Sequence, residues 1–225
     1  MLRWIFFDLG GTLLDDIPFH DLINQTLLNI LAEHGYTVGK DEFIRARDAF
    51  VLKRVPVLGS LVVYFTGGDE LKDPVMKELT RRINHKGAEL QVPFPGSERL
   101  LQDLKECFSL GVIANQQVEV RDLLKNLGWD RLFDVTIISD EIGVWKPNPR
   151  IFEMALDAAQ CKPQEAVMVG DRIDNDVAPA KGLGMRTIRI RAGLFGPQEA
   201  SSESETPDTE ITCLDRLPVV LARLP

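Results

Sequence analysis

The chain has 225 residues, 44% of them hydrophobic, and a formal net charge of −8 at pH 7. This length allows one sizeable core, or one core domain that carries a smaller insert. The acidic balance, with no basic block to offset it, excludes a general nucleic-acid binder or a protein of anionic membrane surfaces. No apolar stretch is long enough to span a bilayer, so we expect no membrane contact.

The cysteine content indicates a reducing compartment. Cys107, Cys161 and Cys213 are odd in number, widely spaced and without metal-site spacing, which argues against a disulfide framework. The apolar run near the N-terminus is broken by Asp8 and is too short for a signal peptide. We therefore expect a cytoplasmic protein. Its oligomeric state cannot be deduced from these features.

The first fifteen residues, M-L-R-W-I-F-F-D-L-G-G-T-L-L-D, are the most informative segment. A short strand over Arg3–Asp8 ends on a carboxylate that is followed by Gly10-Gly11-Thr12. Open α/β folds keep their ligand crevice at the carboxyl ends of the strands. Glycines at such a turn leave backbone N–H groups free to approach a phosphate. The segment therefore predicts an anionic group beside an anion-binding turn.

The next stretch, residues 16–93, has helical periodicity. Pro18 suits a first helical turn, Leu27 and Leu31 fall on one face with their apolar neighbours, and Gly35 would end this helix. Two further amphipathic helices are expected over 41–55 and from 73 to about 86, whereas residues 61–65 fit either a helix or a strand. Proline and glycine at 93, 95 and 96 mark a boundary. We expect an inserted helical cap domain over 16–93.

From residue 97 the pattern alternates between helix and strand. The expected elements are helix Ser97–Cys107, strand Leu110–Ala114, helix Val118–Leu127, strand Val135–Ser139, helix Pro149–Ala159, strand Ala166–Gly170, helix Asp176–Leu183 and strand Arg186–Ile190, with a last strand and helix over 211–224. A polar, acidic surface loop is expected over 198–209. This order predicts an α/β core of a doubly wound parallel sheet, built from residues 1–15 and 94–225.

Three later segments place polar groups at ends of the same sheet. One strand leads to Asn115, a loop carries Lys146-Pro147, and another strand ends at Gly170-Asp171 with Asp176 five residues further on. Together with Asp8 they offer a nucleophile or metal ligand, a cation and an acidic metal site. Hard oxygen ligands beside a phosphate suit Mg²⁺.

These motifs, in this order and with a helical insert after the first, resemble the haloacid dehalogenase superfamily of hydrolases, most of whose members are Mg²⁺-dependent phosphatases. The resemblance implies that Asp8 attacks phosphorus to form an aspartyl-phosphate, and that Lys146 neutralises the repulsion between the two anions. It implies a Mg²⁺ site formed by Asp8, the Gly10 carbonyl, Asp171 and Asp176, and contacts to a small phosphorylated substrate from Gly11, Thr12, Asn115 and Lys146.

Two positions depart from the family pattern. Gly10 stands where phosphatases of the family carry a second Asp as general acid and base, a group that contributes about 10²–10⁴ in rate. Ala114 stands where a Ser or Thr hydroxyl usually contacts the phosphoryl oxygens, a hydrogen bond of about 1.5–3 kcal/mol. Three explanations are open: a substrate with a good leaving group, another acid in place of the missing one, or a domain that binds without catalysing. The candidate acids are Asp15, Asp16, His20 and a carboxylate on the insert.

Three rival chemistries explain fewer of the motifs. The 2-haloacid dehalogenases of the superfamily use no metal and lack the Gly170-Asp171 pair seen here. Phosphonoacetaldehyde hydrolases form a Schiff base on a lysine of the insert, for which Lys40 and Lys53 are the candidates. D-L-G-G-T also resembles the first phosphate loop of actin-like sugar kinases, but that fold needs a hairpin after the glycines, where a helix is expected here.

Overall fold

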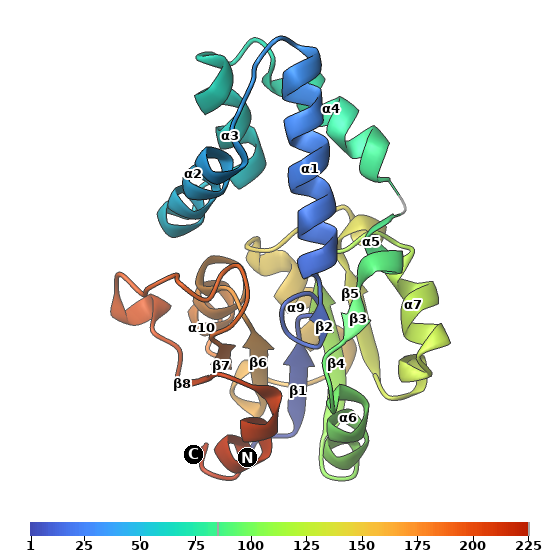
Figure 1. Cartoon of the computed structure of the whole chain (residues 1–225). Helices are drawn as coiled ribbons and strands as arrows, with labels where there is room; N and C mark the ends of the chain where they lie inside the picture. The colour runs from blue at the N-terminus through green and yellow to red at the C-terminus, as the bar shows by residue number, and fades with distance from the viewer. Residues whose placement is uncertain (85, 225) are drawn as a thin grey trace.

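The computed structural model describes residues 1–84 and 86–224 and shows a core domain below a helical cap (Figure 1). The core is built on a six-stranded sheet in the order β5-β4-β1-β6-β7-β8, in which every pair of neighbouring strands is parallel. Its strands are β1 (Trp4–Phe7), β4 (Ser109–Ala114), β5 (Val135–Ile138), β6 (Ala166–Gly170), β7 (Arg186–Ile190) and β8 (Thr209–Ile211). This confirms the expected doubly wound α/β fold.

Both faces of the sheet are covered, which explains its nearly continuous apolar strands. Ile5 and Phe7 of β1 belong to a core shared with α6 (Ser97–Lys105), α7 (Val120–Asn126) and α11 (Leu217–Leu221). Trp4 and Phe6 point to the opposite face, where α9 (Pro149–Ala159) and α10 (Ala178–Gly182) pack. The alternation is the two-residue period of a strand. Because β1 ends at Phe7, Asp8 lies at the carboxyl end of a strand in the middle of the sheet.

The cap consists of helices around a core of its own. They are α1 (Ile17–Glu33), α2 (Lys40–Lys53), α3 (Val57–Thr66), α4 (Lys72–Ile83) and the short α5 (Lys86–Leu90). Their buried apolar residues include Ile23, Leu27, Ile30, Leu31, Phe43, Leu61, Val62, Val75 and Leu79. The cap lies over the carboxyl ends of the sheet strands, and the two chain termini lie at the opposite end of the core (Figure 1).

The two segments that connect core and cap are paired with each other. Strand β2 (Leu14–Asp15) runs antiparallel to β3 (Val92–Pro93), so that the chain enters and leaves the cap through one ladder. Strands of two residues show no periodicity, so the sequence pattern does not predict them. The ladder fixes where α1 starts above the sheet.

Several element boundaries differ from the sequence expectations. Residues 61–65 lie within helix α3, where Leu61 and Val62 pack into the cap core. The helix expected from Asp176 is preceded by a wide π-type turn over Ile173–Val177, and α8 (Ser139–Ile142) is an additional short helix. Helix α4 ends at Ile83, and residue 85 of the expected helix lies outside the described residues. Within those residues, no helix is both long and apolar enough to cross a membrane.

The polar segment after β7 ties the core to the cap. Gln198 is only 1% exposed, its Oε1 accepts a hydrogen bond from Ile173 N, and its Nε2 donates to Val51 O of the cap at 3.5 Å. The Arg54 guanidinium at the end of α2 pairs with Glu205 at 2.7 Å and donates to Glu199 O. The expected surface loop is therefore exposed in its acidic part, but its first residue is buried because it satisfies backbone groups of both domains.

Candidate active site

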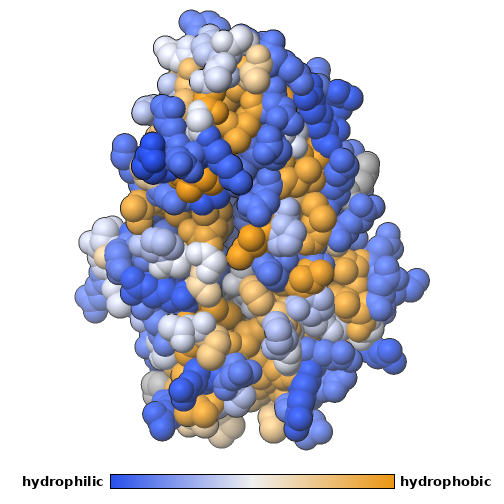
Figure 2. Space-filling view, viewed as in Figure 1, coloured by the Kyte–Doolittle hydropathy of each residue, from blue (hydrophilic) through white to orange (hydrophobic). Residues whose placement is uncertain are grey.

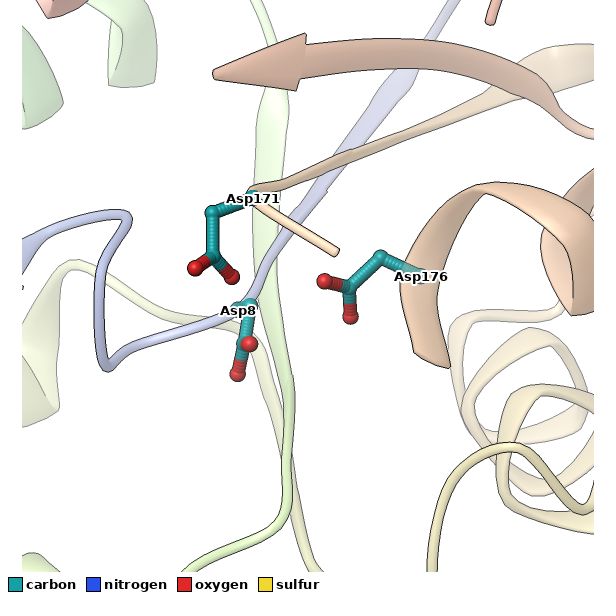
Figure 3. Close-up of side chains that lie close together, drawn as sticks. All are labelled: Asp8, Asp171 and Asp176. Carbon is teal, nitrogen blue, oxygen red and sulfur yellow. The ribbon is translucent and has the colours of Figure 1, made fainter. Parts of the chain in front are cut away.

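Three buried carboxylates converge at the carboxyl ends of β1 and β6. Asp8 follows β1, Asp171 follows β6, and Asp176 lies in the π-type turn after β6. Figure 3 shows the three carboxylates gathered in one place, with those of Asp171 and Asp176 directed toward Asp8, and each residue offers an oxygen within 4.8 Å of the others. Parallel strands end at the same edge of a sheet, which is why residues so far apart in the sequence meet here.

Lys146 is the cation of this cluster. Its ammonium lies 2.6 Å from Asp176 Oδ1 and 2.9 Å from Asp8 Oδ1, and its side chain is 1% exposed. Asp8 Oδ1 also accepts a hydrogen bond of 2.8 Å from Leu9 N, and Asp176 Oδ2 accepts one of 3.0 Å from Arg172 N. When all three carboxyl groups are ionised, one ammonium leaves the cluster with an excess of negative charge. A cation bound among these oxygens would offset that excess.

Burial and mutual repulsion disturb the ionisation of the cluster. Burial, reinforced by the charge of Asp176, raises the pKa of Asp8 to about 6, although Lys146 opposes the shift. Burial also raises the pKa of Asp171 well above its usual range, with Asp176, Asp8 and Asp16 adding to the effect. Burial alone would lower the pKa of Lys146, but the two carboxylates outweigh it and raise that pKa.

Two glycines give the carboxylates their room. Gly11 has φ +67°, and a Cβ on it would lie 2.5 Å from Asp171 Oδ2. A Cβ on Gly170 would overlap the carboxylate of Asp176. Both glycines therefore let backbone approach a carboxylate closely, a role that the sequence pattern alone does not distinguish from phosphate binding.

The other expected phosphate contacts lie in two different places. Asn115 joins the cluster through the loop that carries Lys146, since its Nδ2 donates to Lys146 O at 2.9 Å and its Oδ1 accepts from Lys146 N at 2.8 Å. Thr12 and Gly11 instead line a separate hollow of about 180 Å³, together with Phe94 and Ile190. Thr12 Oγ1 is buried without a hydrogen-bond partner among the described residues. Their contacts to a phosphate remain predictions.

A cleft of about 180 Å³ opens from the cluster toward the cap. Besides Asp8, Lys146 and Asp171, it is lined by Gly10, Asp16, Phe19, His20, Gln91, Asn115, Gln116, Arg172, Asn175 and Phe195. The sequence motifs do not predict a place in the cleft for Phe19, Gln91, Gln116, Asn175 or Phe195. Gln116 directly follows Asn115, and Asn175 directly precedes Asp176, so these two lie within predicted site segments. The others reach the cleft from the cap, a linker and a later loop, where no local motif marks them. Lys40 and Lys53, the candidate Schiff-base lysines, are exposed on α2 and line neither this cleft nor the cavity above it.

A larger cavity of about 610 Å³ adjoins the cleft between core and cap. The two share His20, Arg172, Asn175 and Phe195. Apolar residues such as Ile23, Leu58 and Met76 line the cavity, together with Arg47, Arg54 and Arg172. Each arginine already pairs with a carboxylate: Asp48 at 2.8 Å, Glu205 at 2.7 Å and Asp174 at 2.6 Å respectively. Figure 2 shows apolar side chains at the level where the cap meets the core, bordered by hydrophilic ones.

The donor set of the cluster fits a hard divalent cation. Asp8, Asp171 and Asp176 are carboxylates, they are buried, and they lie close enough together to share one ion. Such cations prefer oxygen ligands, and an excess of buried negative charge is the environment that holds them. A capped α/β core with three clustered carboxylates and a lysine at the strand ends is the arrangement of a class of hydrolases.

The chain belongs to the haloacid dehalogenase-like hydrolase family, whose model matches residues 2–184. It is 33% identical over 220 residues to the glyceraldehyde 3-phosphate phosphatase of Methanothermobacter thermautotrophicus, covering 94% of this chain and 95% of that protein. A haloacid dehalogenase-family phosphatase from Thermococcus onnurineus has a similar structure, with TM-score 0.65, 26% identity and 98% of each chain covered. A 2-haloacid dehalogenase from Pseudomonas syringae matches with TM-score 0.64, 27% identity and 99% of each chain covered.

Proposed function

We propose that the protein is a Mg²⁺-dependent phosphatase that hydrolyses a small phosphorylated metabolite through an aspartyl-phosphate on Asp8. The observation that supports this most strongly is the cluster itself: a strand-end carboxylate held by Lys146 at 2.9 Å and flanked by two more buried carboxylates. An anion that attacks a phosphate ester must have its repulsion screened, and this cluster supplies one cation and the ligands for another.

The chemistry takes two steps on phosphorus. The Asp8 carboxylate attacks, a bond forms between its oxygen and phosphorus, and the bond to the ester oxygen breaks, so that an alcohol leaves after taking up a proton. Water then attacks the aspartyl-phosphate, releasing inorganic phosphate and restoring the carboxylate. Lys146 stabilises the negative charge that accumulates beside Asp8. A Mg²⁺ ion held by Asp8, the Gly10 carbonyl, Asp171 and Asp176 would supply further positive charge there.

The substrate class follows from the two adjoining spaces. The cleft beside Asp8 has room for a phosphoryl group, and the larger cavity has room for a short organic part between apolar walls. The relative from M. thermautotrophicus is a phosphatase of a three-carbon sugar phosphate by its name. We place glyceraldehyde 3-phosphate among the first substrates to test, and we expect neither nucleic acid nor a membrane as partner.

Two alternatives have observations of their own. Gly10 and Ala114 favour a family member that binds a phosphorylated ligand without efficient turnover, because each replaces a group that assists the reaction. The structural likeness to a 2-haloacid dehalogenase favours displacement of halide. Three buried carboxylates argue against the second alternative, since halide leaves without a metal and such a cluster is costly to bury for no purpose.

The direct test is release of inorganic phosphate from a panel of phosphate esters, with Mg²⁺ and after chelation. The panel holds p-nitrophenyl phosphate, glyceraldehyde 3-phosphate and other short phosphorylated metabolites, and 2-chloropropionate serves to detect dehalogenation. Mg²⁺-dependent release from any ester supports the proposal. Saturable binding without release would favour the binding protein, and chloride release without phosphatase activity would favour the dehalogenase.

A further inference from the structure

Position 10 is crowded by a carboxylate from another part of the chain. Glycine is not needed there for the backbone, because Gly11 has a left-handed φ and Gly10 does not. A Cβ on Gly10 would instead lie 2.5 Å from Oδ2 of Asp16 and 3.4 Å from its Cγ. The carboxylate of Asp16 therefore occupies the volume into which a side chain at position 10 would project.

The linker ladder between core and cap holds Asp16 in that place. Asp16 directly follows β2, whose Asp15 pairs with Val92 of β3, and it precedes the first residue of α1. Within the described chain its side chain makes no capping hydrogen bond to the backbone of α1. It lines the cleft together with Asp8 and Lys146, and its side chain is 21% exposed.

His20 approaches the same oxygen. Its Nε2 lies 3.4 Å from Asp16 Oδ2, one helical turn further along α1, and His20 also lines the cleft. The two residues form a polar pair in the lining of the cleft. Asp15, the neighbouring carboxylate, differs: its Oδ1 accepts a hydrogen bond of 3.0 Å from Ile17 N, and it does not line the cleft.

We propose that Asp16 is the proton donor and acceptor of the reaction, in the place of the side chain that is absent at Gly10. The inference rests on the proposed phosphatase activity. In the first step the protonated Asp16 gives its proton to the ester oxygen as that oxygen leaves phosphorus and the Asp8 oxygen bonds to it. In the second step the Asp16 carboxylate takes a proton from water as the water oxygen attacks phosphorus and the bond to Asp8 breaks.

The first experiment compares Asp16→Asn with Asp15→Asn on two phosphate esters. An alkyl ester, glycerol 3-phosphate, needs protonation of its leaving oxygen, whereas the phenolate of p-nitrophenyl phosphate does not. We expect Asp16→Asn to lower kcat/KM for the alkyl ester by about 10²–10⁴. We expect the same variant to release one equivalent of nitrophenolate in a burst and then to stall, with phosphoenzyme detected by mass spectrometry after acid quench, because the base for the second step is missing. Asp15→Asn should behave as the wild type.

A second experiment moves the carboxylate to the position of the usual acid. The double variant Gly10→Asp, Asp16→Gly should recover alkyl-ester turnover by about tenfold or more over Asp16→Asn, since the removed side chain leaves room for the new one. If the double variant stays as slow as Asp16→Asn, the carboxylates are not interchangeable and the proposal is wrong.

Three other results would overturn the inference. Alkyl-ester turnover by Asp16→Asn within about threefold of the wild type would show that no proton passes through Asp16. An equal loss on both esters without accumulated phosphoenzyme would show a structural role only. A wild type that hydrolyses no ester removes the proposed function and this inference together, whereas an active wild type with an equally active Asp16→Asn removes this inference alone.

Discussion

The cleft beside Asp8 and the larger cavity above it differ in size, in polarity and in the parts of the chain that build them. The cleft, of about 180 Å³, rests on strand-end residues whose polar groups are locked by bonds such as the 2.6 Å contact between Lys146 and Asp176. The cavity, of about 610 Å³, is lined mainly by cap side chains, many of them apolar, and its arginines pair with carboxylates beside them.

If the proposed function holds, this difference separates the place of the reaction from the place where the substrate is selected. A charged cluster at the sheet edge can perform one chemistry on many substrates, while a cavity lined mainly by side chains of the cap can change without disturbing that cluster. Changes in the cluster should therefore alter turnover, and changes in the cavity should alter which ester is accepted.

The largest effect is expected from removing Lys146, the cation of the cluster. Lys146→Met leaves Asp8 and Asp176 without the ammonium that lies within 2.9 Å of both, so the charge of the proposed nucleophile, Asp8, would no longer be screened. We expect kcat to fall by about 10²–10³ for every ester that the protein hydrolyses. Steady-state assays at saturating Mg²⁺ measure this, with exposed Lys125→Met as the control. A loss confined to one substrate would break the division.

The next effect is the stabilisation of the folded protein by Mg²⁺ bound at the carboxylate cluster. Mg²⁺ at one hundred times its dissociation constant should stabilise the wild type by about 2.7 kcal/mol, a rise in Tm of roughly 5–10 °C. Asp171→Asn should lose most of this rise because it removes one of the three clustered carboxylates. Thermal unfolding with and without Mg²⁺ measures the shift, and Asp140→Asn on the exposed side of α8 is the control. An unchanged shift in Asp171→Asn would place the ion elsewhere.

A smaller and more selective effect is expected from filling the cavity. Leu58→Trp narrows the cavity wall on α3 without touching the carboxylate cluster. We expect KM for esters with a bulky organic part to rise by about tenfold, with kcat for p-nitrophenyl phosphate nearly unchanged. Leu52→Trp, which alters a leucine 53% exposed on α2, is the matched control. An equal loss of kcat for all esters would show that the cavity and the carboxylate cluster are not independent.

The smallest effect concerns the link between the domains. Glu205 pairs with Arg54 at 2.7 Å, and hydrogen bonds from Arg54 and then Ser201 lower the pKa of Glu205 to about 2. Glu205→Gln should therefore destabilise the protein by less than about 1 kcal/mol at neutral pH. The stabilisation by a carboxylate of lowered pKa is complete above its unfolded pKa of about 4.3 and is lost as pH falls toward 2. Urea unfolding should show equal differences between variant and wild type at pH 7 and 5.5, and a shrinking one below 4.

The core was largely predictable from the sequence because its signals are local. Pro149 opens α9, and the apolar runs of β6 and β7 are bounded by a charged residue or a glycine, so the expected and observed limits agree. The meeting of Asp8, Lys146, Asp171 and Asp176 was expected from motifs at strand ends, and the structure brings these residues together.

The residues that linkers and distant loops bring to the cleft were not predictable in the same way. The β2–β3 ladder has two residues in each strand, and Phe195 reaches the cleft from a loop more than 170 residues after Asp16. The place of Asp16 beside Gly10 depends on that ladder and on the start of α1, so the sequence could name Asp16 only as one of several candidate acids. Tertiary contacts of this kind carry no period or motif.

The measurement that tests the central proposal most directly is the fate of the phosphoryl group in the wild type and in Asp8→Asn. Both proteins are mixed with p-nitrophenyl phosphate and Mg²⁺, quenched in acid within a turnover and examined by peptide mass spectrometry. We predict a phosphorylated peptide that contains Asp8 in the wild type, and neither phosphopeptide nor nitrophenolate release above background in Asp8→Asn. Turnover by Asp8→Asn at a rate close to that of the wild type would contradict the account, because the nucleophile would then lie elsewhere.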